Sequence, residues 1–173
     1  DKYIWREGTL SNNSYQNVSG NVVCSKINGQ VFYKTFDNKI HSMWWDNNSN
    51  TWQWSALNNA ANNVAGDLAI TQDGSQIFYR TTNNKINSIW WDSNIQNWQW
   101  SELNQAANGN VRGPIAVSSN GQVFYRTLDY KLNNIWWNSS TSTWWWSNLN
   151  NAANGNVGDA LAISSNGQIF YKT

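Results

Sequence analysis

The chain has 173 residues, with 11 Lys and Arg against 10 Asp and Glu, and its formal net charge is +1. This balance provides no basic surface for nucleic acid or for an anionic membrane, and no apolar segment approaches the roughly 20 residues of a membrane span. Fourteen Trp, 31 Asn and only 12% charged residues argue against disorder, which requires few aromatic residues and a high net charge. One Cys and one His exclude an internal disulfide and the usual Cys or His metal sites. We therefore expect no metal, no cofactor, no nucleic-acid partner and no membrane insertion.

Aromatic residues recur at a fixed step along the chain. The Phe-Tyr pair that begins at Phe32 returns at Phe78, 46 residues later (78 − 32 = 46), and twice more at the same step. Trp-Trp doublets at 44–45, 90–91 and 136–137 and Trp-x-Trp motifs at 52–54, 98–100 and 144–146 keep this step. A period of this length indicates a solenoid, a propeller or a similar array.

Each repeat reads as four short strands. The apolar segments 22–24, 68–70, 115–117 and 161–163 predict a first strand. An Asn-Gly or Asp-Gly pair follows and predicts a two-residue hairpin turn with positive φ angles. Segments 30–35, 76–81, 122–127 and 168–173 predict a second strand, segments 39–46, 85–92 and 131–138 a third, and segments 52–55, 98–101 and 144–147 a fourth. Ala- and Asn-rich segments such as 57–63 predict connecting loops.

Four strands in each unit of about 46 residues predict an all-β fold, a β-propeller built from four-stranded blades. We expect one domain over residues 1–173, with repeats 18–63, 64–110 and 111–156. A partial repeat 157–173 would be completed by residues 1–17, in which Trp5 begins a lone fourth strand. This gives about four blade equivalents. The ring would close either through the N- and C-terminal strands or through a homodimer.

Several residues have a structural interpretation. Cys24 occupies an apolar repeat position, which predicts a buried thiol, whereas His41 aligns with Asn87 and Asn133, which predicts a surface position. We expect core packing for the repeated Phe and for one Trp of each fourth strand: Phe32, Phe78, Phe124, Phe170, Trp54, Trp100 and Trp146.

The carboxylates do not form a catalytic pattern. Glycoside hydrolysis needs a distinct pair of acids, but Glu7 and Glu102 share one repeat position and Asp46 and Asp92 share another. Calcium would need several carboxylates in one turn, and each turn here offers one. We therefore expect neither an enzyme nor a calcium site.

The Trp-Trp doublets are the candidate binding residues. Adjacent strand residues point to opposite faces of a sheet, so both members cannot fill the same packing layer. One member lies at a strand end beside an acid or amide, and an aromatic face next to hydrogen-bonding groups suits a sugar. Packing remains the alternative. The predicted sugar-binding residues are Trp45, Trp91 and Trp137 for stacking, Asp46, Asp92 and Asn138 for hydroxyl groups, and Arg80 and Arg126 as further donors, with Lys34 and Lys172 in the same position.

Segments 121–138 (GQVFYRTLDYKLNNIWWN) and 144–149 (WWWSNL) carry a resemblance to a known family. The unit resembles the blades of bacterial β-propeller lectins of the PLL-like group, and more loosely those of the tectonin and tachylectin families. The resemblance covers nearly the whole chain. It implies sugar sites between or at the rim of blades, for fucose or methylated sugars, without catalysis or metal. Such lectins have five to seven blades in one chain, whereas this chain has fewer than four complete ones.

The sequence thus predicts a multivalent, tryptophan-rich lectin whose partners are glycans of cell-surface glycoconjugates. This interpretation favours a secreted or cell-surface location over the cytoplasm. The alternatives are a propeller for protein–protein interaction and a glycoside hydrolase.

Overall fold

The structure is a computed structural model that describes residues 18–57, 63–103, 110–149 and 156–173. Over these residues all regular secondary structure is β, in fourteen strands, which confirms the all-β class. In the described part of the chain, no helix is long and apolar enough to cross a membrane. The strand expected at Trp5 and the completing segment 1–17 lie outside the described residues.

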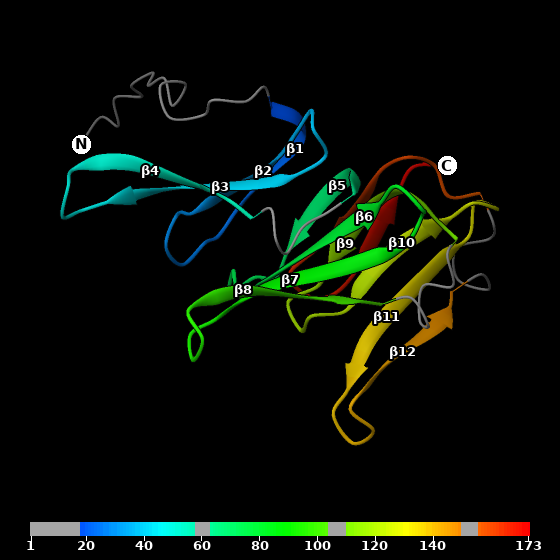
Figure 1. The fold of residues 1–173 in the computed structure, drawn as a ribbon. Helices are drawn as coiled ribbons and strands as arrows, with labels where there is room; N and C mark the ends of the chain where they lie inside the picture. The colour runs from blue at the N-terminus through cyan, green and yellow to red at the C-terminus, as the bar shows by residue number, and fades with distance from the viewer. Residues whose placement is uncertain (1–17, 58–62, 104–109, 150–155) are drawn as a thin grey trace, which may run out of the picture.

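The strands form consecutive antiparallel sheets, which follow one another along the chain in Figure 1. The first sheet contains β1 (Val18–Cys24), β2 (Val31–Thr35), β3 (Ile40–Asp46) and β4 (Thr51–Ala56). The second contains β5 (Val64–Ile70), β6 (Gln76–Thr81), β7 (Ile86–Asp92) and β8 (Asn97–Glu102). The third contains β9 (Val111–Val117), β10 (Val123–Thr127), β11 (Leu132–Asn138) and β12 (Thr143–Asn148). The last sheet contains β13 (Leu161–Ile163) and β14 (Ile169–Tyr171). Each sheet is a simple meander in sequence order.

The first turn of each unit differs from the expected two-residue hairpin. Between β9 and β10 the N–H of Gly121 donates to the carbonyl of Ser118 (3.0 Å), and the N–H of Ser118 donates to the carbonyl of Gln122 (2.9 Å). Gly121 has a φ of 79°, whereas Asn120 is not among the residues with positive φ. The loop therefore has three residues, with a glycine in the left-handed region, which is the next commonest hairpin solution.

Each of the first three sheets packs one face on the following sheet. In the second sheet, the leading face, toward the first sheet, carries Leu68 and Trp98, and the trailing face, toward the third sheet, carries Phe78. Phe32 on the trailing face of the first sheet contacts Trp98 edge to face at 5.8 Å, and Phe78 contacts Trp144 in the same way at 6.0 Å. The middle strands are thus covered on both sides, as their apolar sequences predict.

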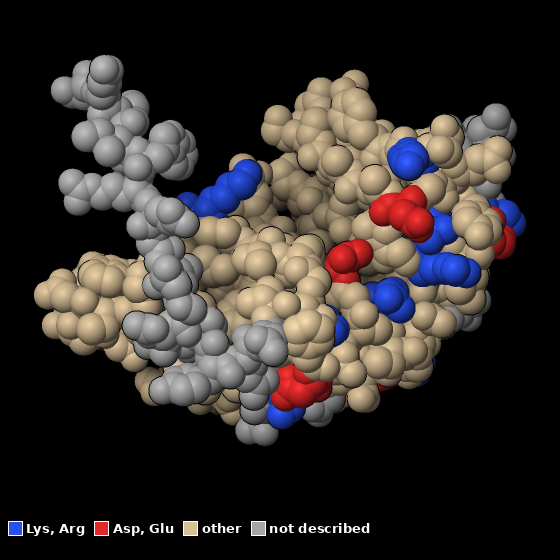
Figure 2. Space-filling model, turned by 90° about the horizontal axis from the view of Figure 1, so that it is seen from above, with Lys and Arg blue, Asp and Glu red and all other residues tan. Residues whose placement is uncertain are grey.

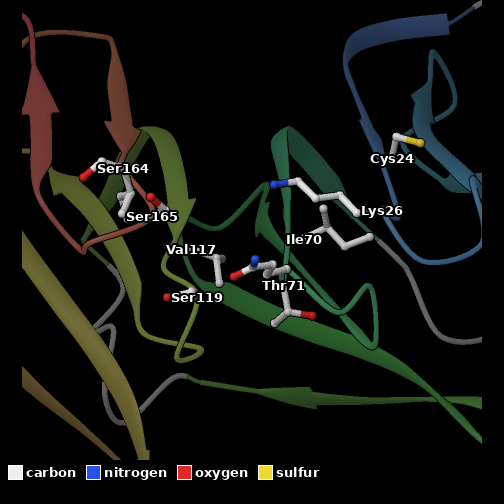
Figure 3. A pocket seen from close by; sticks show the side chains of 10 residues that line it. Cys24, Lys26, Ile70, Thr71, Val117, Ser119, Ser164 and Ser165 are labelled. Carbon is white, nitrogen blue, oxygen red and sulfur yellow. The ribbon is translucent and has the colours of Figure 1, made fainter.

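The first strands lie side by side. Contacts connect β1 with β5, β5 with β9, and β9 with β13, whereas no comparable contact between described elements connects β13 back to β1. The ends of these strands surround a pocket of about 160 Å³ (Figure 3). The first strands of consecutive sheets are therefore neighbours, and in the described part of the chain the series of sheets is not closed.

Burial confirms part of the expected core and corrects the rest. Phe32, Phe78 and Phe124 are buried, but Phe170 on the last sheet is 57% exposed. The predicted core role of the Trp54 series is wrong, because these residues lie on outer strands where neighbouring sheets diverge; the exposed fractions are 39% for Trp54, 49% for Trp100 and 45% for Trp146.

Two further assignments are corrected. Cys24 is exposed, because no sheet of the described structure covers the leading face of the first sheet as the first sheet covers its equivalent Ile70. His41 is buried rather than superficial, with 3% of its surface exposed. Its ring stacks on Trp54 at 5.6 Å with an interplanar angle of 8°.

Candidate functional site

Two clefts at equivalent positions separate consecutive sheets. The first, of about 650 Å³, lies between the first and second sheets. The second, of about 980 Å³, lies between the second and third sheets. Both volumes fall in the range of small-molecule sites. The repeat of the fold therefore produces a repeat of the cleft.

All three candidate stacking residues line these clefts. Trp45 lines the first cleft, Trp137 lines the second, and Trp91 lines both. Their exposed fractions are 45%, 51% and 49%, so part of each indole is open to a ligand. The structure thus brings together the three residues that the doublet pattern singled out, on the walls of adjacent clefts.

A second tryptophan supports each of these indoles. Trp45 faces Trp52 across β3 and β4, Trp91 faces Trp98 across β7 and β8, and Trp137 faces Trp144 across β11 and β12. The three pairs are T-shaped, with ring centroids 5.8, 5.6 and 5.5 Å apart. Since Trp98 and Trp144 also pack on a Phe of the preceding sheet, contacts within the core help to orient the exposed indoles. This role of the fourth strand was not predicted, although the spacing of cross-strand pairs is a signal for it.

Both neighbouring sheets contribute polar residues to each cleft, and turn residues are among them. Asp73 and Ser75, in the turn after β5, line the first cleft, and Asn120, the equivalent of Asp73, lines the second together with Gln122. Hydrogen bonds from the Thr71 hydroxyl and then from Ser75 hold the pKa of Asp73 below its ordinary value of 3.8. Its carboxylate is therefore a charged acceptor at neutral pH. These residues were not predicted as ligand-binding groups, because the sequence pattern around them indicates turns.

The predicted hydroxyl-binding residues lie elsewhere. Asp46, Asp92 and Asn138 begin the turns between third and fourth strands, and they are not among the residues that line the two clefts. Their side-chain oxygens accept backbone N–H groups of Asn48 (3.0 Å), Asn94 (2.9 Å) and Ser140 (3.0 Å). These side chains therefore stabilise turns.

The basic residues are also remote from the clefts. Arg80 lies against Gly66 and donates to the Asn84 side chain at 3.2 Å. Arg126 is 3% exposed, forms an ion pair with Asp159 and lies over the Tyr130 ring. A bulge or register shift in the pairing of the first and second strands of the second and third sheets accompanies these contacts. The cations thus stabilise the junction of first and second strands.

Charge is sparse on the face shown in Figure 2, where acidic and basic groups are scattered among uncharged residues. In the described ranges, no group of three or more His, Cys, Asp or Glu side chains is arranged to hold a metal ion. The chemistry that the two clefts offer is aromatic contact combined with hydrogen bonding.

His41 leads to a prediction about pH. Burial lowers the pKa of His41 below its ordinary 6.5, so the folded protein keeps this ring neutral while the unfolded chain takes up a proton. The free energy of unfolding is expected to fall as the pH falls from about 6.5 toward the lower pKa of the folded state. His41→Asn should remove this dependence. Urea unfolding at about pH 7.5 and pH 5 measures both variants.

The control is built into the repeat. Asn87 and Asn133 occupy the same position and donate to the hydroxyls of Tyr79 (3.3 Å) and Tyr125 (3.2 Å), whereas the buried hydroxyl of Tyr33 has no partner in the described structure. An asparagine at position 41 is thus compatible with the fold. Asp37 titrates in a different range, because its pKa lies below 3.8. An equal pH dependence in both variants would contradict the assignment to His41.

Comparison with known proteins bears on the fold. No family model matches the chain, and no curated protein matches it. Among solved structures, the chain is similar to the crystal structure of a "putative 6-phosphogluconolactonase from Bacteroides uniformis ATCC 8492", with a TM-score of 0.55 and 15% sequence identity. The match covers 88% of this chain and 50% of that chain, so this chain spans about half the length of that protein. At this identity the likeness concerns the fold.

Proposed function

We propose that this protein is a carbohydrate-binding lectin of the β-propeller type, and that its sugar sites are the two clefts between sheets. The observation that carries the proposal is the repetition of one cleft, with an exposed tryptophan on each wall and polar turn residues among the residues that line it. A repeated cleft suits a multivalent binder, because each copy can take the same small ligand.

The chemistry of the clefts matches a pyranose ring. Its C–H face can stack on the half-exposed indoles of Trp45, Trp91 or Trp137, and its hydroxyls can donate to Asp73 or exchange hydrogen bonds with Ser75, Asn120 and Gln122. Methyl groups would gain further apolar contact with the indoles. This is compatible with the fucose or methylated sugars that the family resemblance implies.

The propeller arrangement has its own support. Consecutive four-stranded meanders pack face to face, and their first strands surround one pocket. Radial repetition of four-stranded sheets around a centre defines a propeller. The first strand of each sheet would then be the innermost strand of a blade.

A glycan array followed by calorimetry tests the function. We expect L-fucose or a methylated monosaccharide to bind with a Kd in the roughly millimolar to micromolar range and with at least two sites per chain. Several sites on one surface would raise avidity by about 10²–10⁴, which haemagglutination measures. A blank array, or a stoichiometry of one, would contradict the proposal; the blank array would favour the protein-interaction alternative.

Chelation provides a separate prediction. The proposed contacts use indole rings, amides, hydroxyls and, in the first cleft, the single carboxylate of Asp73, so sugar binding should be unchanged in EDTA. Calorimetry before and after dialysis against EDTA measures this. Loss of binding on chelation that calcium restores would contradict direct recognition by these side chains.

A further inference from the structure

The two ends of the series of sheets expose residues that are buried at every internal junction. Val22, on the leading face of the first sheet, is 53% exposed, whereas its equivalents Leu68 and Ile115 are 2% and 6% exposed. Phe170, on the trailing face of the last sheet, is 57% exposed, whereas the three preceding residues of its series are at most 6% exposed. On the first sheet the exposure is confined to β1, since Tyr33 on the same face is 2% exposed, and each end thus presents apolar residues that the internal junctions cover.

The two end faces carry the same kinds of residues as two faces that pack together at an internal junction. At the first internal junction, Val23 and Phe32 of a trailing face pack in one cluster with Leu68 and Ile70 of a leading face. In the last sheet, Ala162 pairs with Phe170 as Val23 pairs with Phe32. In the first sheet, Val22 and Cys24 occupy the positions of Leu68 and Ile70. A trailing face that carries Ala162 and Phe170 therefore suits a leading face that carries Val22 and Cys24.

The two end faces do not meet within one chain, because no contact comparable to the internal ones connects β13 with β1 among the described elements. Figure 3 shows labelled residues of the four sheets in an arc around the central pocket, with Cys24 and Ser164 at opposite sides of it. The chain also matches half the length of a structure with a similar fold. An arc of this extent leaves room for a second arc of the same size.

We propose that a second copy of this chain docks on these faces. The leading face of the first sheet of each copy packs on the trailing face of the last sheet of the other, so that two equal junctions close a ring. Such head-to-tail contacts close when the rotation per subunit fits a ring. The association buries the exposed Val22 and Phe170 in the same way as the internal junctions bury Leu68 and Phe32. It rests on the packing of the sheets and not on sugar binding.

Light scattering after gel filtration measures the assembly directly. The expected mass is about 40 kDa, twice the 19.8 kDa of the chain. A mass near 20 kDa at all concentrations would overturn the proposal, and a series of larger masses would indicate an open polymer and overturn the ring.

Complementary charges test the junction. Val22→Asp and Phe170→Lys are each expected to give single chains, because a charge would be buried at both junctions. An equimolar mixture should restore the 40 kDa species, since one junction then joins the two introduced charges and the other is native. Both positions are exposed, so the variants should fold, which circular dichroism checks. Ile95→Asp, in an exposed turn at 58%, is the control and should remain dimeric. Dimeric single variants would overturn the assignment of the faces.

A disulfide tests the register of the same junction. Cys24 is the chain's sole cysteine and is equivalent to Ile70. Ala162 is equivalent to Val23, which packs in one cluster with Ile70 at the first internal junction. Ala162→Cys therefore places a second thiol near Cys24 of the other copy. Mild oxidation should give a covalent dimer on a non-reducing gel, whereas Ser140→Cys, in an exposed turn, should give little. A disulfide within one chain would mean that the ends meet in the monomer, and would overturn the proposal.

Discussion

Replacing Trp91 with alanine is expected to weaken sugar binding at both clefts, whereas Trp45→Ala and Trp137→Ala should each weaken one. Trp91 alone among these three residues lines both clefts. Loss of a central aromatic contact typically costs about 2 kcal/mol or more, roughly 30-fold in Kd. Calorimetry should therefore record the loss of one binding site for Trp45→Ala or Trp137→Ala, and weaker binding at both sites for Trp91→Ala.

The matched control is Trp145→Ala. Trp145 is 46% exposed on β12 but does not line either cleft, so its removal should leave the affinity and the stoichiometry unchanged. Because Trp91 is half exposed, its removal should shift the thermal midpoint by only a few degrees. If the Trp91 variant unfolds, Trp91 is a packing residue and not a binding residue. If the variant binds sugar as well as the original protein does, the sugar site lies elsewhere.

Local pattern was sufficient to predict the strands. The repeat spacing and the turn residues are properties of neighbouring positions, and the four-stranded meanders form from neighbours in sequence. The buried Phe78 was predictable because a middle strand is covered on both faces. The exposure of Trp100 was not predictable, because it depends on how far neighbouring sheets have diverged at the fourth strand. The spacing of residues within one strand does not indicate that distance.

Equivalence between repeats also has a physical limit. Cys24 and Ile70 share a repeat position, but Ile70 packs against the preceding sheet while Cys24 lies at the end of the series. The alignment of His41 with two asparagines predicted a surface position, yet Asn87 and Asn133 are themselves buried. An amide or imidazole at this position is compatible with burial because aromatic rings and hydroxyls surround it.

One part of the candidate site, the exposed indoles, could be predicted from the sequence, and the polar groups could not. The exposed indoles follow from the alternation of the doublets, whereas the polar groups opposite them belong to the neighbouring sheet. Asp46 lies next to Trp45 in sequence but points to the other face, where it stabilises a turn. Asp73 is 28 residues from Trp45 (73 − 45 = 28) and lines the same cleft. Such a pairing depends on how two sheets pack, and no local motif specifies it.

Phe78→Ala is expected to destabilise the fold by about 3–5 kcal/mol, the usual cost of removing a fully buried phenylalanine. Phe78 is 0% exposed and packs edge to face on Trp144. Phe36→Ala is the control, because Phe36 is 68% exposed and its loss should change the free energy of unfolding by less than about 0.5 kcal/mol. Urea unfolding measures both variants, and equal values would contradict the packing of the sheets.

The same variant connects the core to the clefts. Phe78 contacts Trp144, and Trp144 in turn contacts Trp137 on the wall of the second cleft. The first cleft depends instead on Phe32, Trp98 and Trp91. In the folded population, Phe78→Ala should therefore lower sugar affinity at the second cleft and leave the first unchanged. Calorimetry below the onset of unfolding measures this difference. A uniform loss at both clefts would mean that the indoles are positioned by the sheet alone and not by the preceding sheet's phenylalanine.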